Sequence, residues 1–146
     1  MPLPDFRFHH TLRIRYAEVD AQGVVFNAHY LTYFDVAHTE YMRATGYDYA
    51  GEVARSGLDF HLVKSVVEYR QPIVFDQLVD IWVRVARIGR TSLSNLFEIH
   101  AAGADDLLAQ GETIMVCADM ATHRPVPVMP SFADAVTRFE GRTLTG

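Results

Sequence analysis

The sequence lacks several features that mark particular classes of protein. It has one cysteine, Cys117, in 146 residues, which excludes an internal disulfide and a metal cage built from cysteines. No stretch approaches the roughly 20 apolar residues of a membrane-spanning helix. The N-terminal residues show no basic segment followed by an apolar stretch, so no targeting signal is expected. These absences predict a cytoplasmic protein without a membrane span.

Positive charge is also scarce. The chain has 13 Lys and Arg against 18 Asp and Glu, and the net charge of −5 excludes the basic surface typical of nucleic-acid binders. Gly-rich phosphate-binding motifs and the Gly-x-Ser-x-Gly nucleophile elbow of serine hydrolases do not occur. Neither His29 nor His38 has a second metal ligand at the next helical turn, so we expect no metal site. Both histidines are predicted to be hydrogen-bonded or at the surface.

What the sequence does contain is apolar and aromatic. Hydrophobic residues make up 49% of the chain, which suits one folded domain over residues 1–146. In residues 6–16 apolar side chains alternate with polar ones, a pattern typical of a half-buried strand. The alternation places Tyr16 on the inward face. There it is either a core aromatic or a residue of a pocket. Gly23 marks the turn that follows.

From residue 28 to 45 the apolar period changes to that of a helix, with Asn27 as a candidate N-cap and Gly46 just past the end. A short helix is expected at 51–55. Strands are expected at 61–71, 78–88, 92–102 and 107–120, and a last helix from Ser131, its cap, to Phe139. Short connections favour an antiparallel meander, and Cys117 is expected to be buried in the last strand. The fold class is therefore α+β, with one long helix against an antiparallel sheet of about five strands.

Asp20 is the position where sequence and chemistry converge. It follows the first strand and precedes the long helix, whose N-terminus presents unpaired N–H groups and the positive end of the helix dipole. An Asp three residues before a Gly is common in ordinary turns, because its side chain accepts backbone N–H bonds. A carboxylate beside a helix N-terminus is also suited to reactions of carbonyl compounds, because the N–H groups can stabilise the negative charge that develops on the carbonyl oxygen.

The run RIRYAEVDAQGVVF at 13–26 resembles the active-site signature of the hydroxybenzoyl-CoA thioesterase family of hotdog-fold enzymes. The run NAHYLTYFD at 27–35 is similar to the start of that family's central helix, and Val63 to Pro72 ends in its Tyr69-x-x-Pro72 pattern. The resemblance implies a hotdog domain that assembles into a homodimer or homotetramer and hydrolyses an acyl-CoA thioester. Coenzyme A would be part of the substrate, and no cofactor is implied.

The resemblance also implies roles for single residues. Asp20 matches the catalytic carboxylate, and Asn27 matches the residue whose backbone N–H polarises the thioester carbonyl. Tyr16 matches a tyrosine that serves the site in some branches. Asn27 stands where the Tol–Pal-associated branch has histidine, and Val19 stands where the family often has Thr or Cys. The signature mixes features of several branches, so acyl-chain preference stays open.

Further residues are candidates for holding the substrate. Tyr30 and Phe34 are expected to line an apolar slot for the acyl group. Arg87, Arg90 and Ser92 are candidates for contacting the phosphates of coenzyme A, because arginine pairs well with phosphate. Asp20 would act either as a nucleophile or as a general base. Two other functions stay open: a non-catalytic acyl-CoA binding or scaffold protein, and a hotdog dehydratase.

Overall fold

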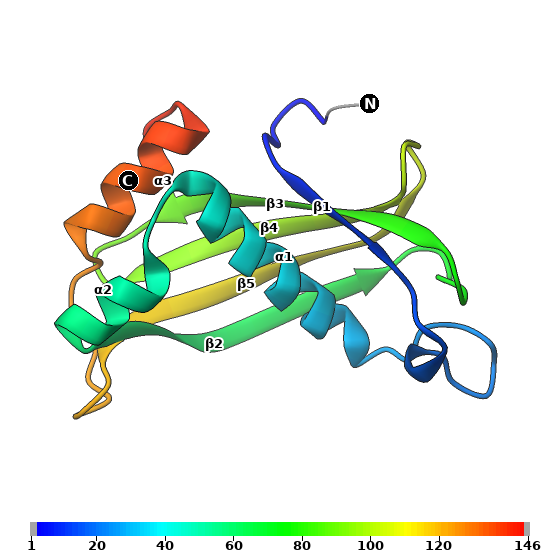
Figure 1. Cartoon of the computed structure of the whole chain (residues 1–146), viewed down its shortest axis with the longest axis horizontal. Helices are drawn as coiled ribbons and strands as arrows, with labels where there is room; N and C mark the ends of the chain where they lie inside the picture. The colour runs from blue at the N-terminus through cyan, green and yellow to red at the C-terminus, as the bar shows by residue number, and fades with distance from the viewer. Residues whose placement is uncertain (1–2, 145–146) are drawn as a thin grey trace. The chain divides into compact units, whose positions relative to one another are not determined.

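The computed structural model describes residues 3–144, which form one long helix, shorter helices and a five-stranded sheet (Figure 1). The strands lie in the order β1-β3-β4-β5-β2 and are antiparallel, which confirms the predicted fold class. In chain order the elements are β1 (His9–Arg13), the 3-10 turn η1 (Tyr16–Glu18), α1 (His29–Thr45), α2 (Tyr49–Ser56), β2 (Leu58–Tyr69), β3 (Leu78–Ile88), β4 (Ser92–Ala101), β5 (Leu107–Asp119) and α3 (Pro130–Glu140).

The position of β2 corrects the predicted meander. Strands β3, β4 and β5 follow one another as expected, but β2 lies at the sheet edge beside β5 and not beside β3. The connection after β2 is held by backbone bonds from the Val25 N–H to the Ile73 carbonyl and from the Asp76 N–H to the Ile14 carbonyl. A strand pattern reports which side chains are buried, but it does not report which strand lies alongside.

Two compact units make up the chain. The first contains the N-terminal stretch up to Tyr41 together with Val66–Arg84 and Phe97–Gly111. The second contains Met42–Ser65, Val85–Leu96 and the stretch from Glu112 onward. Strands β2 to β5 each contribute a segment to both units, as does α1. Among the helices of residues 3–144, none is both long and apolar enough to cross a membrane.

In the first unit, α1 packs closely against the strand segments. Phe34 stacks on Phe97 with ring centroids 4.3 Å apart and an interplanar angle of 14°. Gly111 of β5 lies beneath the Phe34 ring, and a Cβ at this position would also lie 2.6 Å from the Val66 carbonyl oxygen. No real side chain tolerates that distance. Glycine is therefore required here by the close approach of helix and strands.

The first strand is shorter than predicted. Alternation of partly buried and exposed side chains holds from Phe8 to Leu12 and ends at the buried Ile14, which is 1% exposed; η1 then changes the period. As a result Tyr16 leaves the inward face and is 77% exposed, with its ring edge-on to that of Phe75. The expectation that Tyr16 faces inward is wrong, because a 3-10 turn rotates successive side chains by about 120° where a strand rotates them by about 180°.

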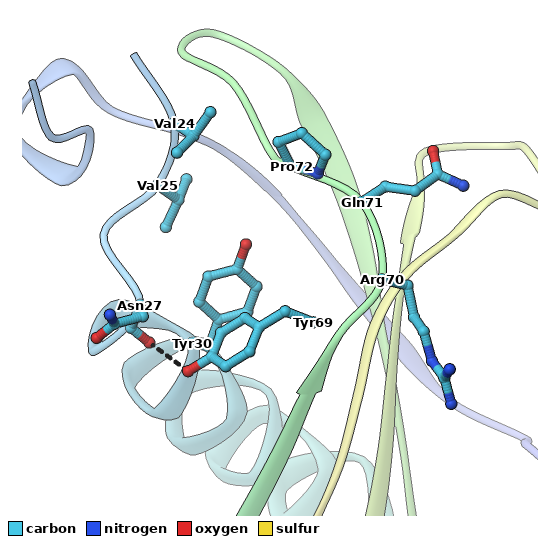
Figure 2. Close-up of a pocket in the computed structure, with 8 residues that line it drawn as sticks. All are labelled: Val24, Val25, Asn27, Tyr30, Tyr69, Arg70, Gln71 and Pro72. Atoms are coloured by element: carbon cyan, nitrogen blue, oxygen red, sulfur yellow. Dashed lines mark hydrogen bonds between the residues drawn. The ribbon is translucent and has the colours of Figure 1, made fainter. Parts of the chain in front are cut away.

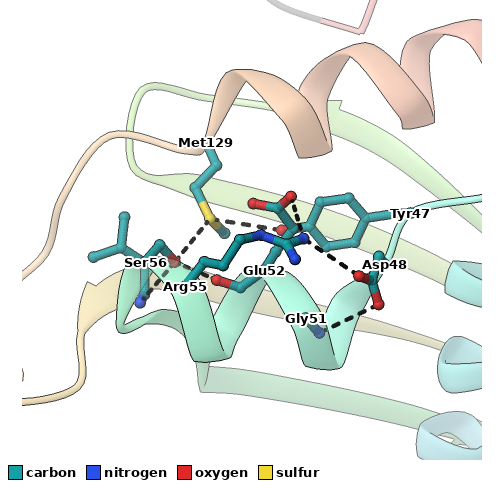
Figure 3. Close-up of polar contacts among 8 residues, drawn as sticks. Tyr47, Asp48, Gly51, Glu52, Arg55, Ser56 and Met129 are labelled. Carbon is teal, nitrogen blue, oxygen red and sulfur yellow. Dashed lines mark hydrogen bonds and ion pairs between the residues drawn. The ribbon is translucent and has the colours of Figure 1, made fainter.

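In the second unit, α2 is fixed by polar contacts at its N-terminus (Figure 3). The Asp48 carboxylate accepts the Gly51 N–H at 3.2 Å and so caps the helix. Arg55 pairs with Asp48 at 3.3 Å and with Glu52 at 2.8 Å. Because the cap lies at Asp48, the helix begins two residues before the predicted 51–55 segment.

The N-cap of the last helix lies two residues earlier than predicted. Met129 precedes α3 and Pro130 occupies its first turn, so Ser131 is inside the helix and is not its cap. Phe132 of α3 packs against Tyr47, and the Met129 sulfur accepts the Tyr47 hydroxyl at 3.6 Å. Cys117 is fully buried in β5, as expected. Burial raises the pKa of its thiol.

His38 lies in the middle of α1. Its side chain is buried within α1, and its Nε2 has no hydrogen-bond partner in the part of the chain that the structure describes. A charged imidazolium would be poorly solvated there, so burial lowers the pKa of His38 to about 4. His38 is therefore not at the surface, which was one of the two environments expected from the sequence.

This buried imidazole makes stability depend on pH. The folded state keeps His38 neutral, whereas the unfolded chain takes up a proton as pH falls below its ordinary pKa of about 6.5. Stability is thus lost between pH 6.5 and pH 4, by about 3 kcal/mol at pH 4. We expect a His38→Leu variant to lose about that much less than the parent when urea unfolding is compared at pH 7 and pH 4. Equal losses in the two proteins would contradict this.

Candidate active site

The segment between β1 and α1 folds into a closed loop in the first unit. Val19 and Val25 form an antiparallel bridge, and the Phe26 N–H donates to the Glu18 carbonyl at 2.9 Å. The Asp20 N–H donates to the Val24 carbonyl, also at 2.9 Å. The loop therefore carries Asp20 at its turn and delivers the chain from Phe26 directly into the helix.

Asp20 sits in the tight turn that its sequence predicts. One carboxylate oxygen, Oδ1, accepts the Gln22 N–H at 2.8 Å, and the Asp20 carbonyl accepts the Gly23 N–H at 2.9 Å. Gly23 has φ of 80°, which favours glycine at this position. The side chain stays partly exposed. The carboxylate thus stabilises the turn through Oδ1.

Glu18 is a buried carboxylate that the sequence analysis missed. It is 6% exposed, and its Oε1 accepts the Arg15 N–H at 2.8 Å while Oε2 contacts the Arg15 guanidinium at 3.2 Å. The Tyr33 hydroxyl of α1 lies near without a hydrogen bond of good geometry. Burial alone would raise the pKa of Glu18, but the interactions with Arg15 and Tyr33 outweigh it and lower that pKa. The i,i+3 spacing of Arg15 and Glu18 was the available signal.

A pocket of about 270 Å³ opens where this loop meets the end of β2 (Figure 2). Its walls come from two segments far apart in the sequence, and the side chains of Arg70 and Gln71 point away from its centre. Tyr30 is 4% exposed and meets Tyr69 edge-on at 4.8 Å. The lining residues are Val24, Val25, Asn27, Tyr30, Tyr69, Arg70, Gln71 and Pro72.

The N-terminus of α1 borders this pocket. The helix begins at His29, one residue after the predicted start at 28, so Asn27 and Ala28 lie directly before it. Within residues 3–144, the backbone N–H groups of Asn27 and Ala28 make no hydrogen bond. Free N–H groups at the positive end of a 17-residue helix form a site suited to negative charge.

The structure brings only some of the predicted residues together. Asn27 and Tyr30 line the pocket, whereas Asp20 and Tyr16 are not among its lining residues. Phe34 is 1% exposed and belongs to the core. Among the described residues, no group of three or more His, Cys, Asp or Glu could hold a metal ion.

The predicted phosphate-binding residues lie in the second unit, around the hairpin between β3 and β4. Arg87 and Arg90 are exposed, and Gly89 donates its N–H to the Ser92 carbonyl at 2.7 Å. A Cβ placed on Gly89 would lie 3.0 Å from the Ser92 hydroxyl oxygen and 3.7 Å from an Arg87 guanidinium nitrogen. Arg87 and Ser92 therefore lie close together at this turn.

The amino-acid sequence is similar to those of known thioesterases and esterases. Residues 14–136 match the thioesterase-like superfamily. The chain belongs to that family. The acyl-CoA thioester hydrolase YbgC of Escherichia coli O157:H7 is 29% identical over 119 residues, which cover 81% of this chain and 87% of that protein. A putative esterase of Aquifex aeolicus is 30% identical over 78 residues, covering 53% of this chain and only 60% of that protein.

Solved structures agree on the fold. A Thermus thermophilus thioesterase complexed with coenzyme A and Zn is 26% identical, with a TM-score of 0.81 over 97% of this chain and 100% of that one. A 1,4-dihydroxy-2-naphthoyl-CoA thioesterase from Synechocystis is 17% identical, with a TM-score of 0.81 over 88% of this chain and 94% of that one. The hotdog fold expected from the sequence is thereby confirmed.

The buried Glu18 carboxylate gives a pH-dependent test of how the loop is held. Because its pKa is lowered on folding, it stabilises the protein above its ordinary pKa of 4.5 and loses this effect as pH falls through the folded value. We expect Glu18→Gln to lower the free energy of unfolding by about 1–2 kcal/mol at pH 7. The difference from the parent should shrink below pH 4.5. A difference that is constant from pH 7 to pH 3 in urea unfolding would contradict this account.

Proposed function

We propose that the protein hydrolyses the thioester bond of an acyl-CoA to a free acid and coenzyme A. The observation that carries the proposal is the α1 N-terminus, where Asn27 lines a pocket and its N–H has no partner within residues 3–144. The loop that leads into this terminus carries Asp20. Family membership and the similarity to YbgC support the same reaction.

The helix N-terminus would stabilise the charge that develops on the carbonyl oxygen. As the carbonyl carbon is attacked, the oxygen becomes negative, and a fixed N–H donor stabilises that state more than the starting thioester. Loss of one such donor costs about 2.7–4 kcal/mol of barrier in known enzymes. The Asn27 side chain is not needed for this role, because the donor is its backbone N–H.

Asp20 would supply the attack by one of two routes. As a nucleophile, its carboxylate oxygen bonds to the carbonyl carbon and displaces the thiolate of coenzyme A, and water then cleaves the resulting anhydride. As a general base, it takes a proton from a water molecule that attacks the carbon directly. Single turnover in ¹⁸O water separates the two routes, because the anhydride route can transfer label to Asp20.

The reaction needs no metal ion in this proposal. A thiol has a pKa of about 8.5, so its thiolate leaves readily without a Lewis acid. The acyl group would lie against Tyr30 in the pocket. Arg87, Arg90 and Ser92 would contact the phosphates of coenzyme A, since two guanidinium groups and a hydroxyl lie at one exposed hairpin.

Removal of the Asp20 charge tests the proposal. Asp20→Asn keeps the size of the side chain but removes its nucleophilic and basic character, so release of coenzyme A thiol from an acyl-CoA panel should fall at least 100-fold. Asp35→Asn is the matched control, because Asp35 is an exposed carboxylate on α1 outside the pocket lining. Thiol release should be unchanged in that variant.

Other outcomes would favour other functions. Binding of acyl-CoA without thiol release by the parent protein would favour a scaffold, and hydration or dehydration of a β-hydroxyacyl thioester would favour a dehydratase. Equal thiol release by Asp20→Asn and the parent would refute the role of Asp20.

We further propose that the protein is a homodimer or homotetramer that assembles through the β2 edge. Strand β2 lies at the edge of the sheet and carries the exposed apolar side chains Leu62, Val63 and Val66. An apolar edge strand offers unpaired backbone groups to another chain. Val63 is 58% exposed, which is unfavourable for a valine unless a partner covers it.

A charge on this edge should disrupt assembly. We expect Val63→Glu to lower the mass measured by light scattering after size exclusion to that of a monomer. Ala104→Glu adds the same charge at an exposed hairpin between β4 and β5 and should leave the mass unchanged. An oligomer that survives Val63→Glu would refute assembly through β2.

A further inference from the structure

Tyr69 makes a contact with the backbone at the start of α1 that the proposed reaction does not yet include. It is the last residue of β2, and its hydroxyl donates to the Asn27 carbonyl at 3.2 Å (Figure 2). Its ring stands edge-on to Tyr30, with an interplanar angle of 83°. Because Tyr30 is almost completely buried, it gives the Tyr69 ring a fixed surface to pack on.

The Asn27 carbonyl is held only weakly by the helix itself. It accepts the Tyr30 N–H at 3.4 Å, which is long for a backbone hydrogen bond. The preceding peptide, between Phe26 and Asn27, is held better, because the Phe26 carbonyl accepts the His29 N–H at 3.0 Å. The hydroxyl of Tyr69 is therefore the shorter of the two contacts that orient the peptide between Asn27 and Ala28.

The orientation of that peptide matters because a peptide unit is planar. The Asn27 carbonyl and the Ala28 N–H turn together about one axis, so a contact that fixes the first also fixes the second. The backbone angles of Asn27 then set the relation between its own N–H and that of Ala28. These are the two N–H groups at the helix start that have no partner within residues 3–144.

We propose that Tyr69 is a positioning residue for thioester cleavage: by binding the Asn27 carbonyl, it holds the donor groups of the α1 N-terminus in the orientation that the reaction requires. The inference rests on the proposed hydrolase function. Tyr69 acts through the backbone of Asn27 and exchanges no proton with the substrate. Its ring, which also lines the pocket, contributes to the wall against which the acyl group lies.

Removal of the hydroxyl alone separates these two contributions. In Tyr69→Phe the ring and its packing on Tyr30 remain, so KM for acyl-CoA should stay within about twofold of the parent. The donor peptide loses its shorter contact, and kcat should fall about 10- to 100-fold, the range expected when a reacting group is misplaced by a fraction of an ångström to one ångström. Amide ¹H–¹⁵N shifts of Asn27 and Ala28 should move at the same time.

Tyr49→Phe is the matched control. Its hydroxyl donates to the Asp59 carboxylate in the second unit, at 2.6 Å to Oδ1 and 2.7 Å to Oδ2, so the variant also loses a phenol hydrogen bond. It should keep the kcat of the parent and the shifts of Asn27 and Ala28. If kcat falls because loss of a phenol hydrogen bond destabilises the protein, it should fall in both variants. That result would refute the proposal.

The remaining outcomes are also decisive. If the parent releases thiol and Tyr69→Phe has the same kcat, Tyr69 has no positioning role, although the hydrolase function stands. A raised KM with unchanged kcat would assign Tyr69 to substrate binding alone and overturn positioning. If the parent releases no thiol from any acyl-CoA, the hydrolase function fails and the inference fails with it.

Discussion

The hydrogen bond from the Phe26 N–H to the Glu18 carbonyl is the constraint on which the candidate active site depends. It closes the loop that begins at a buried carboxylate and ends at the α1 N-terminus. Together with the Val19–Val25 bridge and the bond from the Asp20 N–H to the Val24 carbonyl, it holds the turn at Asp20 next to the helix start. The Glu18 side chain strengthens the closure, because it fixes the preceding 3-10 turn through Arg15. Burying a charge at this point is costly, and that cost is offset by charge-assisted hydrogen bonds.

Much of the fold could be predicted from the sequence because local periodicity determines it. The predicted helix at 28–45 became α1 at His29–Thr45, and β3 spans the predicted residues Leu78–Ile88. The failures arose where the period changes or where pairing is non-local. Tyr16 lies in a 3-10 turn that no alternating pattern indicates, and the pairing of β2 with β5 depends on how the chain after β2 is held.

Only one side of the candidate site, the turn at Asp20 and the start of α1, could be predicted from the sequence. The signature around Asp20 located the turn and the helix start, because those features lie within a few residues of each other. The other half of the pocket comes from the end of β2, about 40 residues later, where Tyr69 and Pro72 close the space opposite Asn27. The Tyr69-x-x-Pro72 pattern was visible in the sequence, but a pattern states nothing about a hydroxyl that reaches a carbonyl 42 positions away.

The turn at Asp20 makes its two carboxylate oxygens inequivalent. Oδ1 is occupied by the Gln22 N–H, and within residues 3–144 no hydrogen bond reaches Oδ2. Rotation about the Cβ–Cγ bond would break the bond to Gln22, so the torsion χ2 is restrained before any substrate arrives. A carboxylate restrained in this way has lost rotational freedom during folding. In the proposed hydrolysis, the turn would supply the entropic part of its alignment with an incoming carbon atom or water molecule, and the bond to Gln22 would select which oxygen reacts.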